Sequence, residues 1–389
     1  MIVVSHPTGN AFVRALLEGL EKEGRLGRFF TTIAAKGWMK FLDQRAYSIP
    51  PERIETSPAR ELVRLTLARL GRLKMDWASV DAVYQALDQR VAKWVRNRAR
   101  GEITTWIYGY EDGALETFRA ARASGIHRAY ELPIAYWETT RRLLREEAER
   151  LPEWEPTLGS TRDSDEKLAR KTEELELADK IFCPSRFVLE SLPYRARERC
   201  LVVPFGSPLA VTARKVSGPG PLRVLFAGSM SQRKGLADLF RAMKLLRRRD
   251  VQLVVMGSTI APMEFYRKQF DGFVYEAPRS RERVFQLMAS CDVLVLPSIV
   301  EGRALVQQEA MSRGLPLVVT RNTGGEDLIE EGRTGFLVPI RAPEEIAARL
   351  DLLAANRTLL AEMSEAARSK AAEYTWEAYA ARISAALPP

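Results

Sequence analysis

Short apolar segments with the pattern of β-strands alternate with helical segments along nearly the whole chain of 389 residues. In the second half, the expected strands are residues 222–227, 251–256, 273–276, 292–296, 315–320 and 336–339. This alternation is typical of parallel sheets whose two faces are covered by helices. We therefore expect an α/β fold built from Rossmann-like sheets.

The first half shows the same alternation before a break in the pattern. Its expected strands are residues 2–5, 103–108, 127–132, 180–184 and 200–205, and its clearest helices are residues 10–20, 79–100 and 114–124. Residues 207–221 (SPLAVTARKVSGPGP) lack periodicity and are rich in Pro, Gly and Ser, as in a linker. Because the chain is too long for one ordinary core, we expect two domains, residues 1–206 and 222–374.

The composition narrows the class of protein. No apolar run approaches the roughly 20 residues needed to span a bilayer, and the start, MIVVSHPTGN, resembles a buried strand more than a signal peptide. Cys183, Cys200 and Cys291 stand isolated in strand-like or helix-end segments, so we expect reduced core thiols in a cytoplasmic protein. Two histidines in the whole chain do not support a His-based metal site or catalytic triad.

The formal net charge of +9 is concentrated in residues 36–101, where 14 Lys and Arg stand against 7 Asp and Glu. Solvated helix faces are the plainest interpretation of this charge. The alternatives are an anionic substrate or an anionic membrane, which would place the protein peripherally at the inner membrane face. We expect no nucleic-acid partner, because no recognition motif accompanies the charge.

Open parallel sheets bind ligands beyond the carboxyl ends of their strands. In the first half, the residues at such ends are His6, Thr8, Gly9, Asn10, Glu111, Asp112 and Glu131. In the second half, they are residues 228–234, 257, 301–305 and 323–325. Two sheets that face one another would place both sets in an interdomain cleft.

Residues 226–235 (FAGSMSQRKG) could bind a diphosphate. Gly228 and Ser229 allow close backbone approach, and Arg233 and Lys234 come just before a helix start. The spacing is neither that of a P-loop nor Gly-x-Gly-x-x-Gly. Taken alone, the two cations could equally be a solvated turn.

Residues 297–316 (PSIVEGRALVQQEAMSRGLP) add two carboxylates. Glu301 follows a strand, and Glu309 falls inside the apolar, inward-packing arc of a helix that starts near Ala304. An unpaired buried carboxylate costs several kcal/mol, and the hydroxyl pair of a ribose would satisfy it. A pair with Arg313 one turn on is the alternative. With Gly302 and the following amides facing a sugar, the set predicts a nucleotide-sugar pocket.

These motifs resemble the donor domain of the family-4 retaining glycosyltransferases of the GT-B fold. The resemblance covers roughly residues 222–372, and its most specific part is the Glu-x7-Glu element with its flanks. Residues 174–192 and 202–206 resemble the last strands of the family's acceptor domain. The helix of about residues 375–389 resembles the segment that crosses back to the first domain. The resemblance therefore implies two Rossmann-like domains facing across a cleft.

The resemblance also implies residue roles. Arg233 and Lys234 would hold the diphosphate, Glu309 the ribose hydroxyls and Glu301 the donor sugar hydroxyls, so Glu301, Lys234 and Arg233 are the expected catalytic residues. The expected donor-binding residues are Gly9, Gly228, Ser229, Gly302, Arg303, Ala304, Leu305 and Glu309.

Two departures from the family pattern leave roles open. The family commonly has Glu-Gly-Phe-Gly, whereas this chain has Arg303 and Ala304 at the last two positions. Arg303 would either read an unusual or anionic sugar or point to solvent, and we favour the second. The family's mid-domain histidine has no secure counterpart, because His127 lies at the start of its strand. The acceptor candidates are His6, Asn10, Glu111, Asp112 and Glu131.

The implied activity is transfer of a sugar from a nucleotide-diphosphate sugar to a glycan, glycolipid or small-molecule acceptor, with retention and without a protein nucleophile. No metal or other cofactor is implied. Asp163 and Asp165 have the Asp-x-Asp form that binds metal in another glycosyltransferase fold, but their charged helix start favours a cap. The alternatives are a nucleotide-sugar epimerase or a phosphorylase on the same architecture, or a non-catalytic membrane-bound scaffold.

Overall fold

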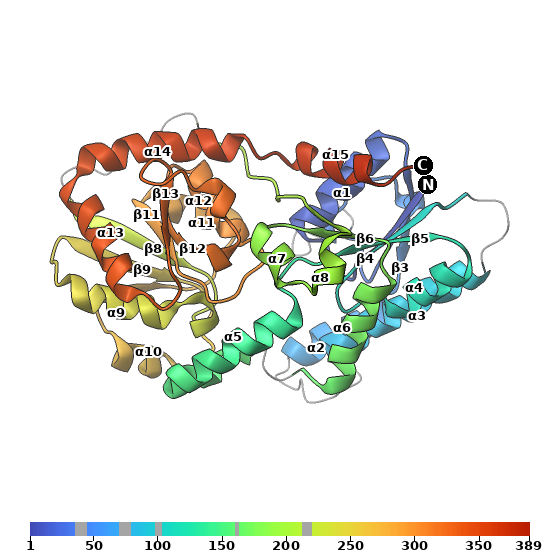
Figure 1. Ribbon diagram of the computed structural model, residues 1–389, viewed down its shortest axis with the longest axis horizontal. Coiled ribbons are helices and arrows are strands. Elements are labelled where there is room, and N and C mark those ends of the chain that lie inside the picture. The colour runs from blue at the N-terminus through green and yellow to red at the C-terminus, as the bar shows by residue number, and fades with distance from the viewer. Residues whose placement is uncertain (36–44, 70–78, 98–102, 160–162, 212–219) are drawn as a thin grey trace.

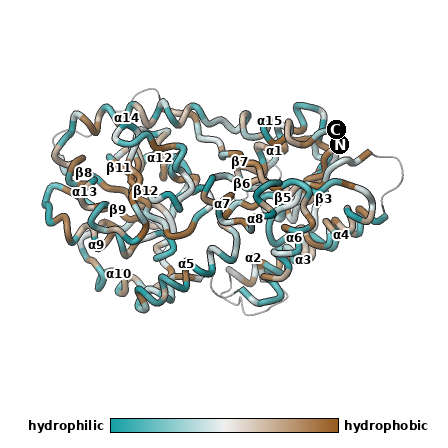
Figure 2. Tube along the Cα trace, in the orientation of Figure 1, coloured by the Kyte–Doolittle hydropathy of each residue, from teal (hydrophilic) through white to brown (hydrophobic). Residues whose placement is uncertain are grey.

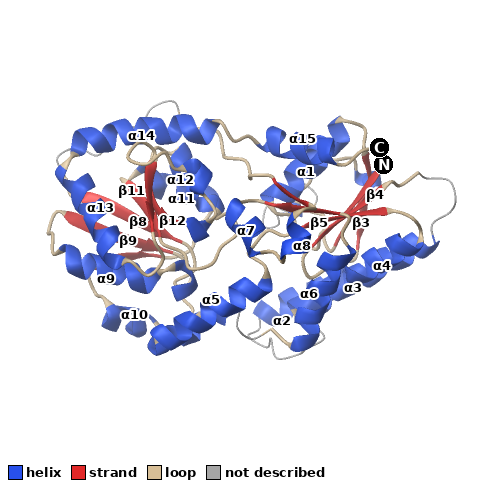
Figure 3. Ribbon diagram, in the orientation of Figure 1, coloured by secondary structure: helices blue, strands red, loops and turns tan. Residues whose placement is uncertain are grey.

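A computed structural model describes residues 1–35, 45–69, 79–97, 103–159, 163–211 and 220–389. The chain forms two parallel sheets, each flanked by helices (Figure 1 and Figure 3). The first sheet has seven strands in the order β3-β2-β1-β4-β5-β6-β7, and the second has six in the order β10-β9-β8-β11-β12-β13. The predicted α/β fold with two wound sheets is confirmed.

The strands of the first sheet are β1 (Ile2–Ser5), β2 (Leu26–Thr31), β3 (Ile54–Thr56), β4 (Trp106–Tyr110), β5 (His127–Glu131), β6 (Lys180–Cys183) and β7 (Cys200–Val202). The strands of the second sheet are β8 (Leu222–Ala227), β9 (Val251–Met256), β10 (Phe273–Glu276), β11 (Val293–Leu296), β12 (Leu317–Thr320) and β13 (Gly335–Val338).

The α-helices of the first half are α1 (Ala11–Lys22), α2 (Pro58–Arg69), α3 (Val80–Asn97), α4 (Leu115–Ala123), α5 (Trp137–Arg150), α6 (Asp165–Leu177), α7 (Arg186–Ser191) and α8 (Tyr194–Arg197). Those of the second half are α9 (Leu236–Leu246), α10 (Met263–Gln269), α11 (Arg281–Ala289), α12 (Leu305–Ser312), α13 (Pro343–Ala355), α14 (Arg357–Ala372) and α15 (Trp376–Ala386). Short 3-10 helices are η2 (Pro51–Arg53), η4 (Pro152–Thr157), η6 (Gln232–Lys234), η7 (Arg321–Thr323) and η8 (Glu326–Leu328).

The strands in the middle of each sheet, β1 and β4 in the first and β8 and β11 in the second, are largely buried. Figure 2 shows β8 and β11 as hydrophobic segments. All four residues of β11 have zero exposure, as expected for a strand covered on both faces. The first-domain strands β2 and β3 are absent from the expected set. Gly27 and Arg28 interrupt the apolar pattern of β2, and β3 has only three residues.

Residues 343–372 form two consecutive helices, α13 and α14. Asn356 ends α13 and its side chain accepts a hydrogen bond from the Leu359 amide at 2.9 Å, which starts α14. The expected helix over residues 79–100 is α3. Its first residue, Val80, is 53% exposed, and the last residues of the expected range lie outside the described part.

Each domain receives a segment from the other half of the chain. Helix α15 packs on α1 of the first domain, where Tyr379 and Ile383 join the core (Figure 1). In the other direction, α5 and η4 extend along the second domain, and Leu151 and Trp154 join its core. The division of the chain at residues 206 and 222 stays a prediction.

The order of the strands positions the candidate loops. In the first sheet β1 and β4 are neighbours, and in the second sheet β8 and β11 are neighbours, so the strand order reverses at these pairs. Loops at such switch points diverge and leave a crevice for a ligand. The loops after β1, β4, β8 and β11 carry most of the candidate residues.

Two of the three cysteines are not isolated. Cys183 in β6 and Cys200 in β7 lie on paired strands, and their sulfur atoms are 3.4 Å apart. This contact across the sheet was not predicted, because the spacing of the two residues in the sequence does not show it. All three cysteines are free thiols. Within the described ranges, no helix combines the length and apolar character needed to cross a membrane.

Candidate functional site

The loop after β8 is shaped by two glycines. Gly228 has φ of 152° and Gly235 has φ of 75°, values that strain other residues. A Cβ on Gly235 would lie 2.0 Å from the Pro297 carbonyl oxygen, so only glycine lets η6 pack on the loop after β11. A Cβ on Gly228 would lie 3.3 Å from Cε of Lys234. The lysine stem therefore lies over the Gly228 backbone.

Arg233 and Lys234 both pair with Glu301. The Arg233 Nη1 and Lys234 Nζ atoms lie 2.6 Å and 2.5 Å from the same carboxylate oxygen, Oε1. Arg233 also donates to the Val300 carbonyl at 3.0 Å, and its own carbonyl accepts from the Ile299 amide. The structure thus joins the three expected catalytic residues into one cluster at the switch point of the second sheet.

Burial and charge act in opposite directions on this cluster. Burial raises the pKa of Glu301, but the charges and hydrogen bonds of Lys234 and Arg233 lower it by more than burial raises it. The net shift of the pKa is downward, so the carboxylate is ionised. Burial lowers the pKa of Lys234, with Glu301 acting against it. Two cations against one carboxylate leave a net positive charge in a largely desolvated place.

Glu309 lies in a different place from the other three. Its side chain is 23% exposed, and its Oε1 lies 3.7 Å from Nε of Arg281. The prediction that Glu309 faces the packed side of its helix is wrong, because Gln307 and Gln308 occupy that side with zero exposure. Gln308 donates across to the Phe205 carbonyl at 2.6 Å.

Glu309 instead lines an interdomain cavity of about 780 Å³. The first domain contributes the loop after β1 and the start of α1, and the second contributes α11 and α12. The expected donor-binding residues that line it are Gly9, Leu305 and Glu309. Arg14 holds the loop after β1 at the rim of this cavity, because its guanidinium donates a hydrogen bond to the Gly9 carbonyl.

Gly302 and Ala304 are used in packing. A Cβ on Gly302 would lie 1.7 Å from the Pro133 carbonyl oxygen, and Ser185 Oγ donates to the Gly302 carbonyl at 2.6 Å. The Ala304 amide donates to the Thr323 carbonyl at 3.3 Å. Gly302 thus joins the two domains, and the Ala304 amide is engaged within the protein, contrary to the expectation of amides that face a sugar.

Arg303 does not point to solvent. Its side chain has zero exposure, and its Nη1 lies 2.6 Å from Asp327 Oδ1. Its Nε donates to Gln308 Oε1 at 2.9 Å, and the guanidinium stacks 5.0 Å from the centre of the Tyr374 ring. The expectation that Arg303 points to solvent is therefore wrong: its side chain ties α12 to η8 and to Tyr374, which follows α14.

Glu131 is also not a cleft residue. Its carboxylate is 1% exposed and accepts hydrogen bonds from the hydroxyls of Tyr108 at 2.6 Å and Tyr379 at 2.9 Å. Burial raises its pKa to about 7, against these hydrogen bonds and one from Tyr110. Glu131 is therefore engaged within the protein core rather than placed to contact an acceptor. Its hydrogen bonds hold α15 against β4 and β5.

The remaining acceptor candidates lie near the cleft. His6 is buried edge-on against Tyr110, 4.6 Å between ring centres, and burial lowers its pKa to about 4. Asn10 is exposed and lines the Glu309 cavity and a second one of about 430 Å³. His6, Glu111 and Asp112 line that second cavity too.

Glu111 and Asp112 belong to a charged cluster at the end of β4. Lys171 Nζ lies 3.5 Å from Glu111, 3.7 Å from Asp112 and 3.1 Å from Asp163. Burial raises the pKa of Glu111 to about 7, although Lys171 lowers it. Lys167 pairs with Asp163 at 3.0 Å, so two lysines neutralise the first carboxylate of the Asp-x-Asp segment. Across the described part of the chain, no three His, Cys, Asp or Glu side chains form a metal-binding group.

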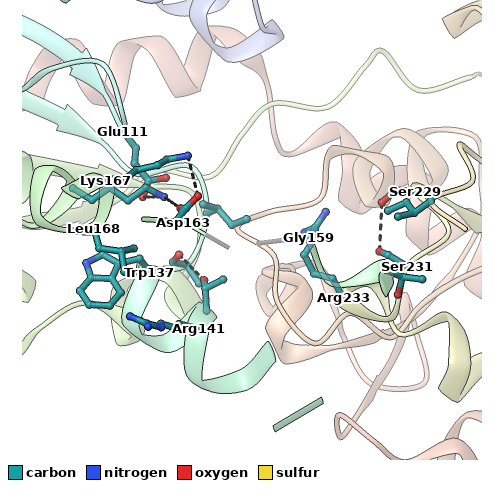
Figure 4. A pocket seen from close by; sticks show the side chains of 16 residues that line it. Glu111, Trp137, Arg141, Gly159, Asp163, Lys167, Leu168, Ser229, Ser231 and Arg233 are labelled. Atoms are coloured by element: carbon teal, nitrogen blue, oxygen red, sulfur yellow. Dashed lines mark hydrogen bonds and ion pairs between the residues drawn. The ribbon is translucent and has the colours of Figure 1, made fainter. Parts of the chain in front are cut away.

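A cavity of about 480 Å³ lies between this cluster and the second domain. In Figure 4, Glu111, Trp137 and Arg141 line one side, and Ser229 and Arg233 line the other. Ser229 thus opens toward the first domain, with its Oγ 3.5 Å from Ser231 Oγ. The cavity is therefore lined in part by Arg233, one of the two cations that pair with Glu301.

Comparison with known protein families decides what the second domain is. Residues 221–356 match the family model described as "Glycosyl transferases group 1". The chain contains a group 1 glycosyltransferase domain. This range holds the Arg233, Lys234 and Glu301 cluster and also Glu309.

The group 1 domain has curated relatives. A D-inositol 3-phosphate glycosyltransferase of Paenarthrobacter aurescens is 29% identical over 174 residues, which cover 42% of this chain and 43% of the relative. The sulfoquinovosyl transferase SQD2 of Arabidopsis thaliana is 32% identical over 165 residues, 41% of this chain and 32% of the relative. The matches therefore span less than half of each relative.

Solved structures match the whole chain in shape. Sucrose-phosphate synthase from Thermosynechococcus elongatus gives a TM-score of 0.71 at 18% identity and covers 99% of this chain and 97% of its own. Anabaena Alr3699/HepE, solved in complex with UDP, gives 0.64 at 16% identity and covers 99% of both chains. The glycosyltransferase domain is thus one half of a GT-B fold.

Several residues around the glycosyltransferase domain carry no signal in the sequence. Trp137 and Arg141 lie in α5, whose sequence resembles any amphipathic helix. Gln232 precedes the predicted diphosphate cations and has zero exposure, yet a glutamine in a loop is ordinarily solvated. The spacing of Lys167 and Lys171, one helical turn apart, was the one available hint of the charged cluster.

Proposed function

We propose that the protein is a retaining glycosyltransferase that moves a sugar from a nucleotide-diphosphate sugar to an acceptor hydroxyl. The observation that carries this proposal is the cluster of Arg233, Lys234 and Glu301 at the second switch point. Two cations beside a single carboxylate leave a net positive charge that suits a diphosphate.

The donor fits along the interdomain cleft in this proposal. Its nucleoside occupies the cavity lined by Gly9, Leu305 and Glu309, with the ribose hydroxyls donating to Glu309. Its diphosphate reaches Arg233 and Lys234. The Anabaena fold neighbour, which was also solved with UDP-glucose, supports a nucleotide-sugar donor, as does the group 1 domain.

Glu301 changes partner when the donor binds. In the free protein its carboxylate satisfies both cations, and an incoming diphosphate competes for them. The carboxylate is then available to accept hydrogen bonds from the sugar hydroxyls. Binding thus exchanges one anion for another around the same two cations, and the cations remain paired throughout.

The chemistry follows the movement of charge. Breaking the bond between the anomeric carbon and the phosphate oxygen leaves positive charge on the sugar and negative charge on the diphosphate. Arg233 and Lys234 stabilise that anion, and one such donor is worth on the order of 3 kcal/mol. The acceptor hydroxyl attacks from the face that the phosphate leaves, and the phosphate oxygen takes its proton. The configuration is therefore retained.

The acceptor occupies the cavity of about 480 Å³ between Glu111, Trp137 and Arg233. Trp137 offers an aromatic face and Glu111 a hydrogen-bond acceptor, which together suit a sugar or polyol.

Contact of residues 36–101 with anionic membrane is a further proposal. Within its described part, α2 exposes Leu62, which is 51% accessible, and Arg60 is exposed on the same helix. Sedimentation with anionic vesicles tests that contact.

A thermal-shift screen followed by a transfer assay tests the proposed function. Sugars of UDP, GDP, ADP, dTDP and CMP are added singly, and one of them raises the melting temperature. At 100 times its dissociation constant a ligand adds about 2.7 kcal/mol of stability. Transfer is then assayed with that donor, and NMR of the product shows retention.

The same assay separates the alternatives. An epimerase converts the donor sugar without acceptor, and a phosphorylase needs inorganic phosphate. A scaffold binds none of the five donors. Any of these outcomes, or an inverted product, contradicts the proposed function.

A further inference from the structure

The 3-10 turn η6, which carries Arg233 and Lys234, begins at Gln232. This glutamine has zero exposure, and each of its side-chain polar atoms is engaged. Its Oε1 accepts from the Ala237 amide at 2.9 Å, and its Nε2 donates to Asp238 Oδ2 and to Glu147 Oε2, both at 2.8 Å. Its backbone amide donates to Thr157 Oγ1 at 3.0 Å. The turn is therefore fixed by specific hydrogen bonds on its buried side.

Two of these four partners come from the first half of the chain. Glu147 lies in α5 and is 85 residues before Gln232, and Thr157 lies at the end of η4 and is 75 residues before it. The segment over residues 137–157, which we call the arm, therefore contacts the buried side of η6. Figure 1 shows α5 extending beneath the second domain.

The arm makes this contact through a buried, charge-balanced network. Arg150 binds Asp238 with two hydrogen bonds of 2.9 and 2.8 Å and Glu147 with two of 3.2 and 2.8 Å. Arg341 of the second domain donates to Glu147 as well. Burial raises the pKa of Glu147, but hydrogen bonds from Arg150 and Gln232 bring it below its usual value. Two carboxylates thus face two guanidiniums, which keeps the buried charges compensated.

The arm is also anchored by apolar packing. Trp154 is 1% exposed, and its ring centre lies 4.9 Å from that of Phe265 and 6.0 Å from that of Phe240. Leu151 belongs to the same core. Because Trp154 and Leu151 are buried in the core of the second domain, they fix the position of the Thr157 hydroxyl next to η6.

We propose that the arm is a positioning device for the donor site. Glu147 and Thr157, acting through Gln232, hold η6 in the geometry in which Arg233 and Lys234 both face Glu301 and an incoming diphosphate. This inference rests on the proposed function for the role of the two cations, and it makes that site dependent on the first half of the chain. Glu147 and Gln232 line none of the cavities described above, whereas Thr157 lines the cavity of about 480 Å³ that also contains Arg233. All three are positioning residues for the donor site, because they act on Arg233 and Lys234 through η6.

The test compares two arm variants with a matched control. Glu147→Gln removes the charge that Gln232 and both arginines share, and Thr157→Val removes the hydroxyl that accepts from the Gln232 amide. Glu146→Gln is the control, because Glu146 also pairs with Arg341, at 2.9 Å, but does not contact η6. Thr157→Ser restores the hydroxyl and serves as the rescue variant.

The first readout is hydrogen–deuterium exchange of the amides of residues 229–237 in the full chain without ligand. We expect exchange there to accelerate about tenfold in Glu147→Gln and Thr157→Val and to stay unchanged in Glu146→Gln and Thr157→Ser. Acceleration over the whole second domain to the same degree would show a general loss of stability and would overturn the proposal.

The second readout is the dissociation constant for UDP, GDP, ADP and dTDP, measured by titration calorimetry. We expect the best of these to bind about tenfold more weakly to both arm variants, which is about 1.4 kcal/mol, and within twofold of wild type to the control. Native exchange and native affinity in a folded Thr157→Val overturn the proposal, even if Glu147→Gln fails to fold. If wild type binds none of the four nucleotides, the proposed function fails, and the exchange readout still decides the role of the arm.

Discussion

At the scale of single residues, Glu301 is the side chain on which the account depends most. It is the shared counter-ion of Arg233 and Lys234 in the free protein, and the proposed mechanism turns it into a sugar ligand. Its carboxylate therefore opposes binding of the bare diphosphate and favours binding of the sugar. These two effects can be separated by substitution.

We predict that Glu301→Gln binds nucleoside diphosphate several-fold more tightly than wild type and transfers sugar at least a hundredfold more slowly. Removal of the charge frees both cations for phosphate, whereas the lost carboxylate weakens the contact with the sugar. Calorimetry with the best nucleotide and a transfer assay measure the two effects. Weaker nucleotide binding, or undiminished transfer, would contradict the role given to Glu301.

Glu131 gives a prediction on stability and pH. Its pKa is raised to about 7 in the folded protein, so the native state holds its proton more firmly than the unfolded chain does. Stability then falls as pH rises from the unfolded pKa of about 4.5 to about 7, by on the order of 3 kcal/mol. Glutamine resembles the protonated form and lacks this loss.

We therefore expect the melting temperature of Glu131→Gln to rise relative to wild type between pH 5 and pH 7.5, with the two proteins similar at the acid end. Thermal unfolding in buffers across this range measures the difference. A constant offset at every pH would show that the pKa of Glu131 is the same in the folded and unfolded states, so that burial does not raise it.

The sequence predicted the residues at the second switch point because their chemistry is local. Arg233 and Lys234 follow a strand directly, and Glu301 follows another, so the topology alone brings them together. Arg303 could not be predicted, because its partner Asp327 comes from η8 and its stacking ring, Tyr374, from the end of α14. Glu131 was misjudged for the same reason, since Tyr379 reaches it from 248 residues away.

At the scale of elements, the loop after β11 joins the two domains. Gly302 lies against Pro133, which follows β5 of the first domain, and its carbonyl accepts from Ser185. A Cβ at this position would lie 1.7 Å from a backbone oxygen, where no flexible side chain can move aside. The domains must separate to accommodate it.

We predict that Gly302→Ala lowers transfer by at least tenfold while each domain remains folded, because the separated domains misalign acceptor and donor. Gly113→Ala is the matched control, since a Cβ there meets Tyr84 at an ordinary 3.5 Å. Small-angle scattering should show a larger radius of gyration for Gly302→Ala alone. An unchanged radius with full activity would contradict this view of the contact.

Most elements of the second domain could be predicted, because β8, β9 and β10 are mainly apolar segments with the expected bounds. The first domain was harder. Strand β2 has an interrupted pattern, and α5 looks like a solvated helix although its end enters the other domain. Periodicity shows that a helix has an apolar face but not which domain covers that face.

At the scale of the whole molecule, the two halves exchange segments, α15 in one direction and the arm in the other. The cleft therefore has walls that each depend on both halves. This arrangement favours a site that works with fixed protein charges. Arg233 and Lys234 pair with Glu301 of the second domain, and the preceding Gln232 is bonded to Glu147 and Thr157 of the first half.

We predict that transfer does not require a divalent metal, because these two cations supply the charge that stabilises the departing diphosphate. Activity measured in excess EDTA should equal activity without it, and added Mg²⁺ or Mn²⁺ should change the rate less than twofold. Loss of activity in EDTA that returns with a metal would contradict the prediction.

Lys234→Ala tests the central claim most directly. Titration calorimetry of wild type and variant with the sugar nucleotide chosen by the thermal-shift screen measures donor affinity, and a transfer assay at saturating donor measures turnover. We predict that the variant binds the donor at least tenfold more weakly and turns over a hundred to a thousand times more slowly. Wild-type affinity together with wild-type turnover in a folded Lys234→Ala protein would show that the cluster with Glu301 does not hold the diphosphate.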